Sequence, residues 1–315
     1  MSGKIIFMGT PDFAVESLKQ ILENGIEVAA VVTAPDRPAG RGQQLSASAV
    51  KEFAVSKGLT ILQPEKLKDE DFLNELKTIN ADLFVVVAFR MLPEVVWNMP
   101  PKGTINLHGS LLPQYRGAAP INWAVINGEK KTGATTFFIE KEIDTGKVID
   151  KVEIDISDTD TAGSVHDRLM VKGAELLAKT VKQILDGTVK AIPQNELIKG
   201  ELKEAPKIFK PDCKIDWNHS TVEIYNKIRG LSPYPAAWTS IQKDDQVRSI
   251  KLFKTTKALD GSSHSNEIKI EKDHLYFGTA DGWLQIDELQ IEGKKRMNVS
   301  DFLKGFQIQD WKLIN

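Results

Sequence analysis

Cysteine is almost missing from this sequence, since Cys213 is the only one in 315 residues. A single cysteine cannot build an intramolecular disulfide framework or a cysteine-rich metal site. Histidine is also sparse. Apart from His108, the histidines are scattered along the chain without a metal-ligand spacing: His166, His219, His264 and His274. We therefore expect no bound metal.

Long hydrophobic runs are missing as well. No stretch is apolar enough to span a bilayer, and the run at residues 5–8 is too short for the apolar region of a signal peptide. We therefore expect a cytoplasmic protein that does not bind membranes. The GxGxxG fingerprint of dinucleotide-binding proteins is also absent after the first apolar run.

What is present is an ordinary globular composition. Apolar residues make up 41% of the chain and charged residues 27%, and the formal net charge is −2. A length of 315 residues suggests two domains.

The first part of the chain alternates apolar runs with helical patterns. Residues 4–8 and 27–33 are typical of buried parallel strands, and a helical stripe lies between them. Thr10 is placed to cap this helix, with Pro11 as its first residue. Residues 82–88 form the strongest strand pattern. This order predicts an α/β fold with a Rossmann-like, mostly parallel sheet.

The pattern then changes twice. Residues 133–140 and 147–156 are predicted to form a hairpin on the edge of this sheet. Residues 158–161 supply caps for a long helix, which Gly187 ends.

Residues 190–206 carry two prolines and no periodicity, which is typical of a linker. Short strands and one helix follow, and they predict an OB-like β-barrel. The expected organisation is a catalytic domain at 1–189, the linker, and the OB-like domain at 207–315.

Residues 34–48 form a long loop rich in proline and glycine that carries Arg37 and Arg41. Arginine binds phosphate through a bidentate contact, and glycine allows a phosphate to approach closely. The alternative is a mobile surface loop with solvated charges.

Asn106 and His108 are two residues apart, so on a strand their side chains leave the same face. Each alone, like Asp144 downstream, is more often a structural residue. Together, an amide and an imidazole can polarise a carbonyl and hold an oxyanion, while a carboxylate orients the imidazole and helps to move a proton. No nucleophile elbow is evident, and Ser110 follows His108 too closely to be the nucleophile. We therefore favour direct attack by a nucleophile of the substrate.

These residues resemble the methionyl-tRNA formyltransferase family, and the resemblance covers nearly the whole chain. The matching segments are residues 8–14, 35–42, 63–64, 106–113, 115–120, 144–146, 215–217 and 229–235. The run Asn-x-His-x-Ser-Leu-Leu-Pro with Asp-Thr-Gly is specific to formyltransferases that use 10-formyltetrahydrofolate. The loop at 35–42 and the second domain narrow the resemblance to the tRNA enzymes.

The resemblance implies formyl transfer from 10-formyltetrahydrofolate, a co-substrate, to the α-amino group of methionine on initiator tRNA. Asn106 and His108 would hold the oxyanion, and Asp144 would pair with His108 and assist proton transfer. Arg37 and Arg41 would contact the tRNA. The folate site would be formed by two segments, which comprise Phe89, Arg90, Met91, Ser110, Leu111, Leu112 and Pro113.

The sequence departs from the family at a few positions. Gln43 and Gln44 stand where many members have two lysines, which removes two charges from the loop. Arg90 and Ala236 each replace a frequent glycine. We also predict a cis peptide at Leu112-Pro113, because the loop must turn sharply there.

Two other functions stay open. One is a related folate-dependent formyltransferase that acts on a small amine, and the other is a non-catalytic RNA-binding protein. No hydrophobic seam demands a dimer, so we expect a monomer.

Overall fold

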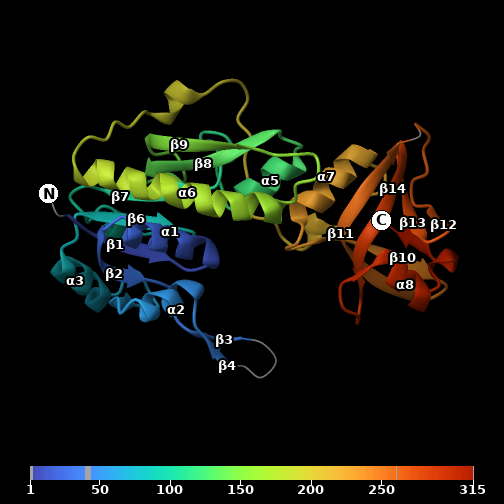
Figure 1. The fold of residues 1–315 in the computed structure, drawn as a ribbon, viewed down its shortest axis with the longest axis horizontal. Coiled ribbons are helices and arrows are strands. Elements are labelled where there is room, and N and C mark those ends of the chain that lie inside the picture. The colour runs from blue at the N-terminus through green and yellow to red at the C-terminus, as the bar shows by residue number, and fades with distance from the viewer. Residues whose placement is uncertain (1–2, 40–43, 260, 315) are drawn as a thin grey trace. The chain divides into compact units, whose positions relative to one another are not determined.

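The computed structural model describes residues 3–39, 44–259 and 261–314. The chain packs into two compact units, which do not follow the sequence as two simple halves (Figure 1). Unit 1 contains the residues up to Gly117, Gly133–Ile154 and Asp167–Glu204. Unit 2 contains Ala118–Thr132, Asp155–His166 and the residues from Ala205 onward.

Unit 1 is built on a seven-stranded sheet. The first five strands in spatial order are parallel, and β8 runs antiparallel to β7. The order is β5 (Ile61–Leu62), β2 (Glu27–Val32), β1 (Lys4–Gly9), β6 (Leu83–Val87), β7 (Thr104–His108), β8 (Lys131–Phe138) and β9 (Val148–Asp155). The predicted α/β fold with a hairpin on the edge of a mostly parallel sheet is confirmed.

The central strands of this sheet are buried on both faces, which explains their continuous apolar runs. Helices cover the sheet, and those with residues in unit 1 are α1 (Asp12–Glu23), α2 (Ala49–Ser56), α3 (Glu70–Ile79), α4 (Glu94–Trp97) and α6 (Ala162–Leu185). On one face, Ile6 and Val86 pack with Phe72 of α3 and Val96 of α4.

Helix α6 fits closely against β7 and β8. A Cβ added at Gly173 would lie 3.1 Å from the Leu107 side chain, so glycine lets the helix approach the sheet there. The hydroxyls of Thr136 on β8 and Thr180 on α6 lie 3.0 Å apart. These contacts fix the strand that carries Asn106 and His108 against a long helix.

The helix boundaries give one correction and one confirmation. Pro11, not Thr10, is the N-cap of α1, because Pro11 is still extended and the helix begins at Asp12. The start of α6 follows the prediction, since the side chains of Thr161 and Ser164 each accept the backbone N–H of the other. Gly187 lies beyond the end of this helix with φ +70°.

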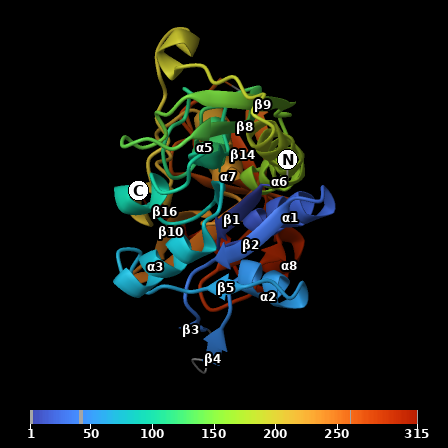
Figure 2. The ribbon, with the colours of Figure 1, turned by 90° about the vertical axis from the view of Figure 1, so that its left-hand side faces the viewer.

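The predicted loop at 34–48 contains a small hairpin of β3 (Arg37–Ala39) and β4 (Gln44–Ser46). Both views show the hairpin projecting from unit 1 (Figures 1 and 2). Its base is tied down by Asp36, whose carboxylate accepts bonds from Lys51 and from Gln63, the latter at 2.9 Å. These two donors lower the pKa of Asp36. Arg41 and Gln43 lie outside the described residues.

Unit 2 is an antiparallel sheet that curls into a half-barrel. Its strands in order are β12 (Ile268–Glu271), β13 (His274–Thr279), β14 (Gly282–Ile291), β11 (Gln246–Leu259), β10 (Ala237–Lys243) and β16 (Lys312–Ile314), and β15 (Met297–Asn298) pairs with β14. The strand β12 at one edge contacts the 3-10 turn Ile308–Asp310, which precedes the strand at the other edge. The predicted OB-like barrel class is confirmed in this form.

The core of unit 2 contains Trp217, which is fully buried and meets the ring of Phe277 edge-on with centroids 5.3 Å apart. The helices that lie wholly in this unit are α5 (Pro120–Ile126), α7 (Thr221–Leu231) and α8 (Val299–Gly305). Helix α7 packs on α5, and Gly230 O accepts a bond of 2.8 Å from the Asn122 amide. A capping box of Ser220 and Glu223 begins α7.

Among the described residues, no helix combines the length and the apolar character that crossing a membrane requires.

Candidate active site

The strand β7 carries Asn106 and His108 at its carboxyl end, between β6 and β8. Asn106 lies opposite Val86 on one side and Phe137 on the other, and His108 lies opposite Thr135. Ligands of open α/β sheets bind beyond the carboxyl ends of the strands. Both side chains are therefore held by a paired, buried strand at the edge where a ligand is expected.

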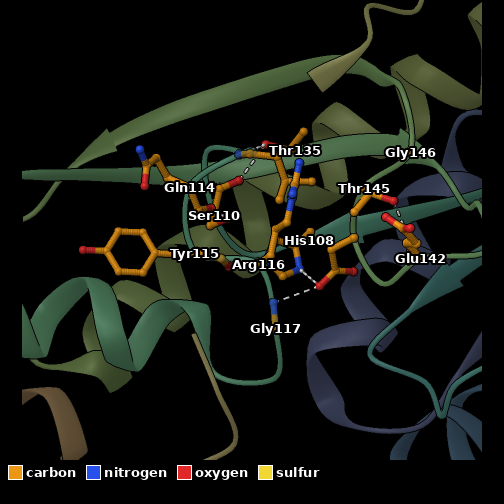
Figure 3. Close-up of polar contacts among 12 residues, drawn as sticks. His108, Ser110, Gln114, Tyr115, Arg116, Gly117, Thr135, Glu142, Thr145 and Gly146 are labelled. Carbon is orange, nitrogen blue, oxygen red and sulfur yellow. Dashed lines mark hydrogen bonds and ion pairs between the residues drawn. The ribbon is translucent and has the colours of Figure 1, made fainter. Parts of the chain in front are cut away.

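Protein groups face both ring nitrogens of His108, and the side chain is only 7% exposed. Nε2 lies 2.8 Å from the carbonyl oxygen of Tyr115. Because a carbonyl only accepts, this contact places a proton on Nε2. Nδ1 lies 3.7 Å from Oδ2 of Asp144, which is too long for a hydrogen bond but short enough for an ion pair (Figure 3). Nδ1 is thus the nitrogen that a substrate can engage.

Asp144 sits on the turn between β8 and β9 in a left-handed backbone conformation, with φ +54°. Its Oδ2 accepts the backbone N–H of Gly117 at 3.0 Å. Thr145 Oγ1 closes the turn by donating to Glu142 O at 3.0 Å (Figure 3). A Cβ at Gly146 would lie 1.8 Å from a backbone oxygen of β8, so only glycine fits this close approach.

The amide of Asn106 makes no hydrogen bond within the described residues, and its Oδ1 is buried. Leaving a buried polar atom unpaired costs about 1–3 kcal/mol. An amide kept in this state at the end of a strand, next to a histidine, points to a polar ligand that supplies the missing partner.

Hydrogen bonds of Ser110 and Thr135 hold the loop after β7 in place. Ser110 is fully buried, and its hydroxyl donates to Gln114 O at 2.6 Å. Thr135 Oγ1 donates to Ser110 O at 2.6 Å and accepts from the N–H of Leu112 at 3.1 Å. The Leu112-Pro113 peptide is cis, as predicted. Of the four residues in this loop that are predicted to line the folate site, only Leu111 is more than marginally exposed, and the other three build the loop itself.

The segment that leaves β6 contains the other predicted folate residues. Ala88 adopts φ +46°, Phe89 packs on the adjoining core, and Met91 is 73% exposed. The Arg90 guanidinium donates to Glu65 O at 2.9 Å and to Pro64 O. Arg90 therefore fastens this segment to the chain after β5.

Burial is the main cause that lowers the pKa of Arg90, and the charge of Arg37 lowers it further, while Glu65 opposes both. The exposed Arg37 on β3 is therefore within electrostatic range of Arg90. The structure brings the trio Asn106, His108 and Asp144 into one site.

Sequence reasoning missed four groups that shape this site: Tyr115, Gly117, Thr135 and Gln194. The first two stand in a segment noticed only for its family pattern, and Thr135 looked like any strand threonine. Gln194 lies in the segment interpreted as a linker, where no periodicity marks a partner. Its side-chain amide donates to the carbonyls of Asp144 and Gly146.

No group of three or more His, Cys, Asp or Glu residues able to hold a metal occurs in the described part of the chain. A cavity of about 400 Å³ lies between α1, α2 and α6, lined by Asp12, Val15, Glu16, Ala49, Glu52, Phe53 and Met170. Its lining shares no residue with the trio, and three carboxylates make it unsuited to an anionic ligand.

Comparison with known proteins gives a consistent result. The formyl transferase family profile matches residues 3–181, and the profile of the formyl transferase C-terminal domain matches residues 207–307. The chain is 57% identical to a methionyl-tRNA formyltransferase of Phocaeicola vulgatus over 98% of this chain and 97% of that protein. It is 55% identical to one of Parabacteroides distasonis over 96% of each.

Solved structures with the same fold are more distant in sequence. The sugar 3N-formyl transferase WlaRD superposes with a TM-score of 0.65 at 21% identity, over 94% of this chain and all of that one. HypX from Aquifex aeolicus, in complex with tetrahydrofolic acid, gives a TM-score of 0.62 at 18% identity, over all of this chain and 51% of that one.

Proposed function

This chain belongs to the methionyl-tRNA formyltransferase family, and from that premise we propose that it transfers the formyl group of 10-formyltetrahydrofolate to the α-amino group of methionine on initiator tRNA. The observation that carries the proposal is the site at the end of β7. There, an unpartnered Asn106 amide, a buried His108 ring and the Asp144 carboxylate come together.

Asn106 and His108 polarise the formyl group in this proposal. The Asn106 NH2 and the His108 Nδ1–H donate to the formyl oxygen, which becomes negative as the amine adds to the formyl carbon. His108 can offer Nδ1 because Nε2 is already engaged by Tyr115 O. The Asp144 carboxylate lies 3.7 Å from Nδ1, close enough for an ion pair when the ring donates from both nitrogens.

Asp144 also stands where a proton has to move. A new bond forms between the methionine nitrogen and the formyl carbon, and the bond from that carbon to the folate nitrogen breaks. The proton lost by the amine ends on the released folate nitrogen, so no oxidant or metal is needed. Oδ2 is fixed by the Gly117 N–H, which keeps the carboxylate beside the ring during this exchange.

The residues around the trio fit a folate. The buried, unpaired Oδ1 of Asn106 has a hydrogen-bonding capacity that a bound ligand can use. The backbone at Phe89–Met91 and the loop Ser110–Pro113 leave neighbouring strands, because β6 pairs with β7. Leu111 and the exposed Met91 supply apolar surface for a ring. The Ser110 hydroxyl fixes the loop by donating to Gln114 O.

For the tRNA, we propose that the hairpin β3–β4 delivers Arg37 and Arg41 to the phosphates, with unit 2 as a second contact. The support is the projection of the hairpin (Figure 2) and the bonds that anchor its base at Asp36. The cytoplasmic location and the monomeric state stay predictions.

The decisive experiment supplies purified protein with 10-formyltetrahydrofolate and Met-tRNA and measures formylmethionine after deacylation. Uncharged tRNA, free methionine and an amino-sugar nucleotide are the control acceptors. We expect transfer to Met-tRNA alone. Transfer only to the amino sugar, or binding of tRNA without transfer, would overturn the proposal in favour of the small-amine or the RNA-binding alternative.

A further inference from the structure

Gln194 lies in the connecting segment, residues 190–206, but unlike a typical residue of such a segment it is buried. It begins the 3-10 turn Gln194–Leu197, and it is only 3% exposed. Its side chain does not cap its own turn. It reaches instead to two segments that lie 50 and 78 residues earlier in the sequence, at Asp144 and Arg116.

The amide of Gln194 is fully used by these contacts. Its NH2 group donates to Asp144 O and to Gly146 O, each at 2.8 Å. Its Oε1 accepts from Arg116, at 3.1 Å from Nε and 2.7 Å from Nη2. A glutamine has two amide donors and one carbonyl acceptor, so every polar group of the side chain is satisfied.

These partners are the supports of the catalytic pair. Arg116 lies between Tyr115, whose carbonyl holds Nε2 of His108, and Gly117, whose N–H holds the carboxylate of Asp144 (Figure 3). Gln194 therefore joins the backbone that carries Asp144 to the segment that orients both the ring and the carboxylate.

The turn needs such a support. A non-glycine residue in the left-handed region costs about 1–2 kcal/mol, and Asp144 adopts φ +54°. Without the two amide bonds, the backbone at Asp144 is free to relax toward an ordinary conformation, and a backbone change there redirects the carboxylate. The 3.7 Å distance to His108 depends on that direction.

We propose that Gln194 is a positioning residue that sets the distance and orientation of Asp144 relative to His108, and this inference rests on the proposed function. Gln194 touches no reacting atom. It acts through Asp144, which makes its effect separable from a general loss of packing.

The chain supplies a matched control in Gln114. Its side chain also joins the connecting segment to the loop after β7, because Nε2 donates to Glu201 O at 2.9 Å and Oε1 accepts from Lys203 N at 2.8 Å. Gln114→Met thus removes two bonds to this segment and leaves the support of Asp144 intact.

The test is a double-mutant cycle on kcat. Gln194→Met should lower kcat about 10-fold or more, because small misplacement of a catalytic group costs rate, while KM for both substrates changes little. In an Asp144→Ala background the same change should lower kcat no further. A wild-type kcat in Gln194→Met, or an equal loss in both backgrounds, overturns the proposal. If Gln194→Met does not fold, Gln194→Ala replaces it. The shorter alanine side chain leaves room for water at the carbonyls of Asp144 and Gly146.

A second readout needs no substrate. The NMR signal of the His108 ring, assigned by His108→Gln, is compared at one fixed pH. In Gln194→Met this signal should shift from its wild-type position, because the carboxylate that lies 3.7 Å from Nδ1 has moved, whereas in Gln114→Met it should match wild type. Identical ring signals in all three proteins overturn the inference. If wild type fails to formylate Met-tRNA, the proposed function fails and the ring signal still decides the role of Gln194.

Discussion

The backbone N–H of Gly117 donates to Oδ2 of Asp144 at 3.0 Å, although the two residues are 27 positions apart. The same oxygen lies 3.7 Å from Nδ1 of His108. The neutral N–H of Gly117 therefore fixes the Asp144 carboxylate. The charge of this carboxylate acts on the His108 ring without a direct hydrogen bond to it. A substitution can thus remove the charge of Asp144 and keep the bond that anchors it.

Asp144→Asn tests this separation. The asparagine oxygen can still accept the Gly117 N–H, but the charge beside His108 is lost. We expect kcat to fall by about 10²–10⁴-fold with little change in the melting temperature, since proton management is lost and the fold is kept. Asp144→Ala should lower kcat similarly and also lower the melting temperature. The exposed Glu142 lies on the same turn, and Glu142→Gln serves as the charge control. A near-normal kcat in Asp144→Asn would remove Asp144 from the mechanism.

Asn106→Ala separates catalysis from stability in another way. The amide forms no hydrogen bond in the described part of the chain, so its loss should leave the melting temperature unchanged or higher. Loss of one oxyanion donor should lower kcat by about 10²–10³-fold. Thermal unfolding and steady-state kinetics on the same preparation check both parts. Strong destabilisation would mean that the amide has a structural partner, and a normal kcat would contradict its proposed role.

Arg37→Ala tests the hairpin as an RNA contact. Arg37 is exposed on β3, where its charge can meet a phosphate. We expect KM for Met-tRNA to rise, KM for the folate to stay constant, and the slope of log Kd against log salt to fall by about 1. Lys68→Ala, which removes an exposed charge of the same sign elsewhere in unit 1, is the control. Equal effects of both variants would show that only the net charge matters.

Asp281→Asn tests a pH-dependent support of unit 2. The Asp281 carboxylate accepts the first N–H of α7 and the hydroxyl of the same residue, Thr221, at 2.7 and 2.8 Å. These bonds lower the pKa of Asp281, with the backbone bond as the larger cause. A lowered folded pKa means that the ionised group stabilises the fold above the unfolded value, and that this stability is lost as pH falls through the folded value.

The urea midpoint of Asp281→Asn should therefore lie below that of wild type at neutral pH. The two midpoints should converge in acid, where Asp281 itself becomes neutral. A constant difference across the pH range would show that the substitution acts through packing and not through charge.

The parts of the fold that the sequence predicted are those with a local pattern. The strands at residues 4–9 and 83–87 are continuous apolar runs because they are buried on both faces. The sequence predicts a loop in place of the hairpin β3–β4 because strands of three residues leave no periodicity. It predicts Thr10 as the N-cap because no local pattern shows that Pro11 stays extended.

The site was predictable only where residues are neighbours in sequence. Asn106 and His108 share a strand, so their common face follows from spacing alone. The contacts of Gln194 could not be predicted, because an amide satisfied across 50 and 78 residues leaves no signal in its own segment. Residues 118–132 and 155–166 pack with the C-terminal part of the chain, and no local pattern in these segments indicates this packing.

Arg229 holds residues 155–166 in unit 2. It is 5% exposed, and its Nη1 donates to Ser157 O at 3.1 Å and to Asp160 O at 3.0 Å, while Nε donates to Asn226. Burial is the main cause that lowers its pKa. Arg229→Met should destabilise unit 2 by about 1.5–3 kcal/mol, because the carbonyls of Ser157 and Asp160 lose a charged donor.

Amide hydrogen exchange in α7 is the appropriate measurement, since a chain of two units need not unfold in one step. Exchange should become faster in α7 and β11, whereas the amides of β1 and β6 in unit 1 should keep their rates. Arg229→Lys should lose less, because a lysine ammonium can still reach one of the carbonyls. Equal acceleration in both units would mean that Arg229 supports global folding, and unchanged exchange in α7 would contradict its role as the residue that fastens residues 155–166.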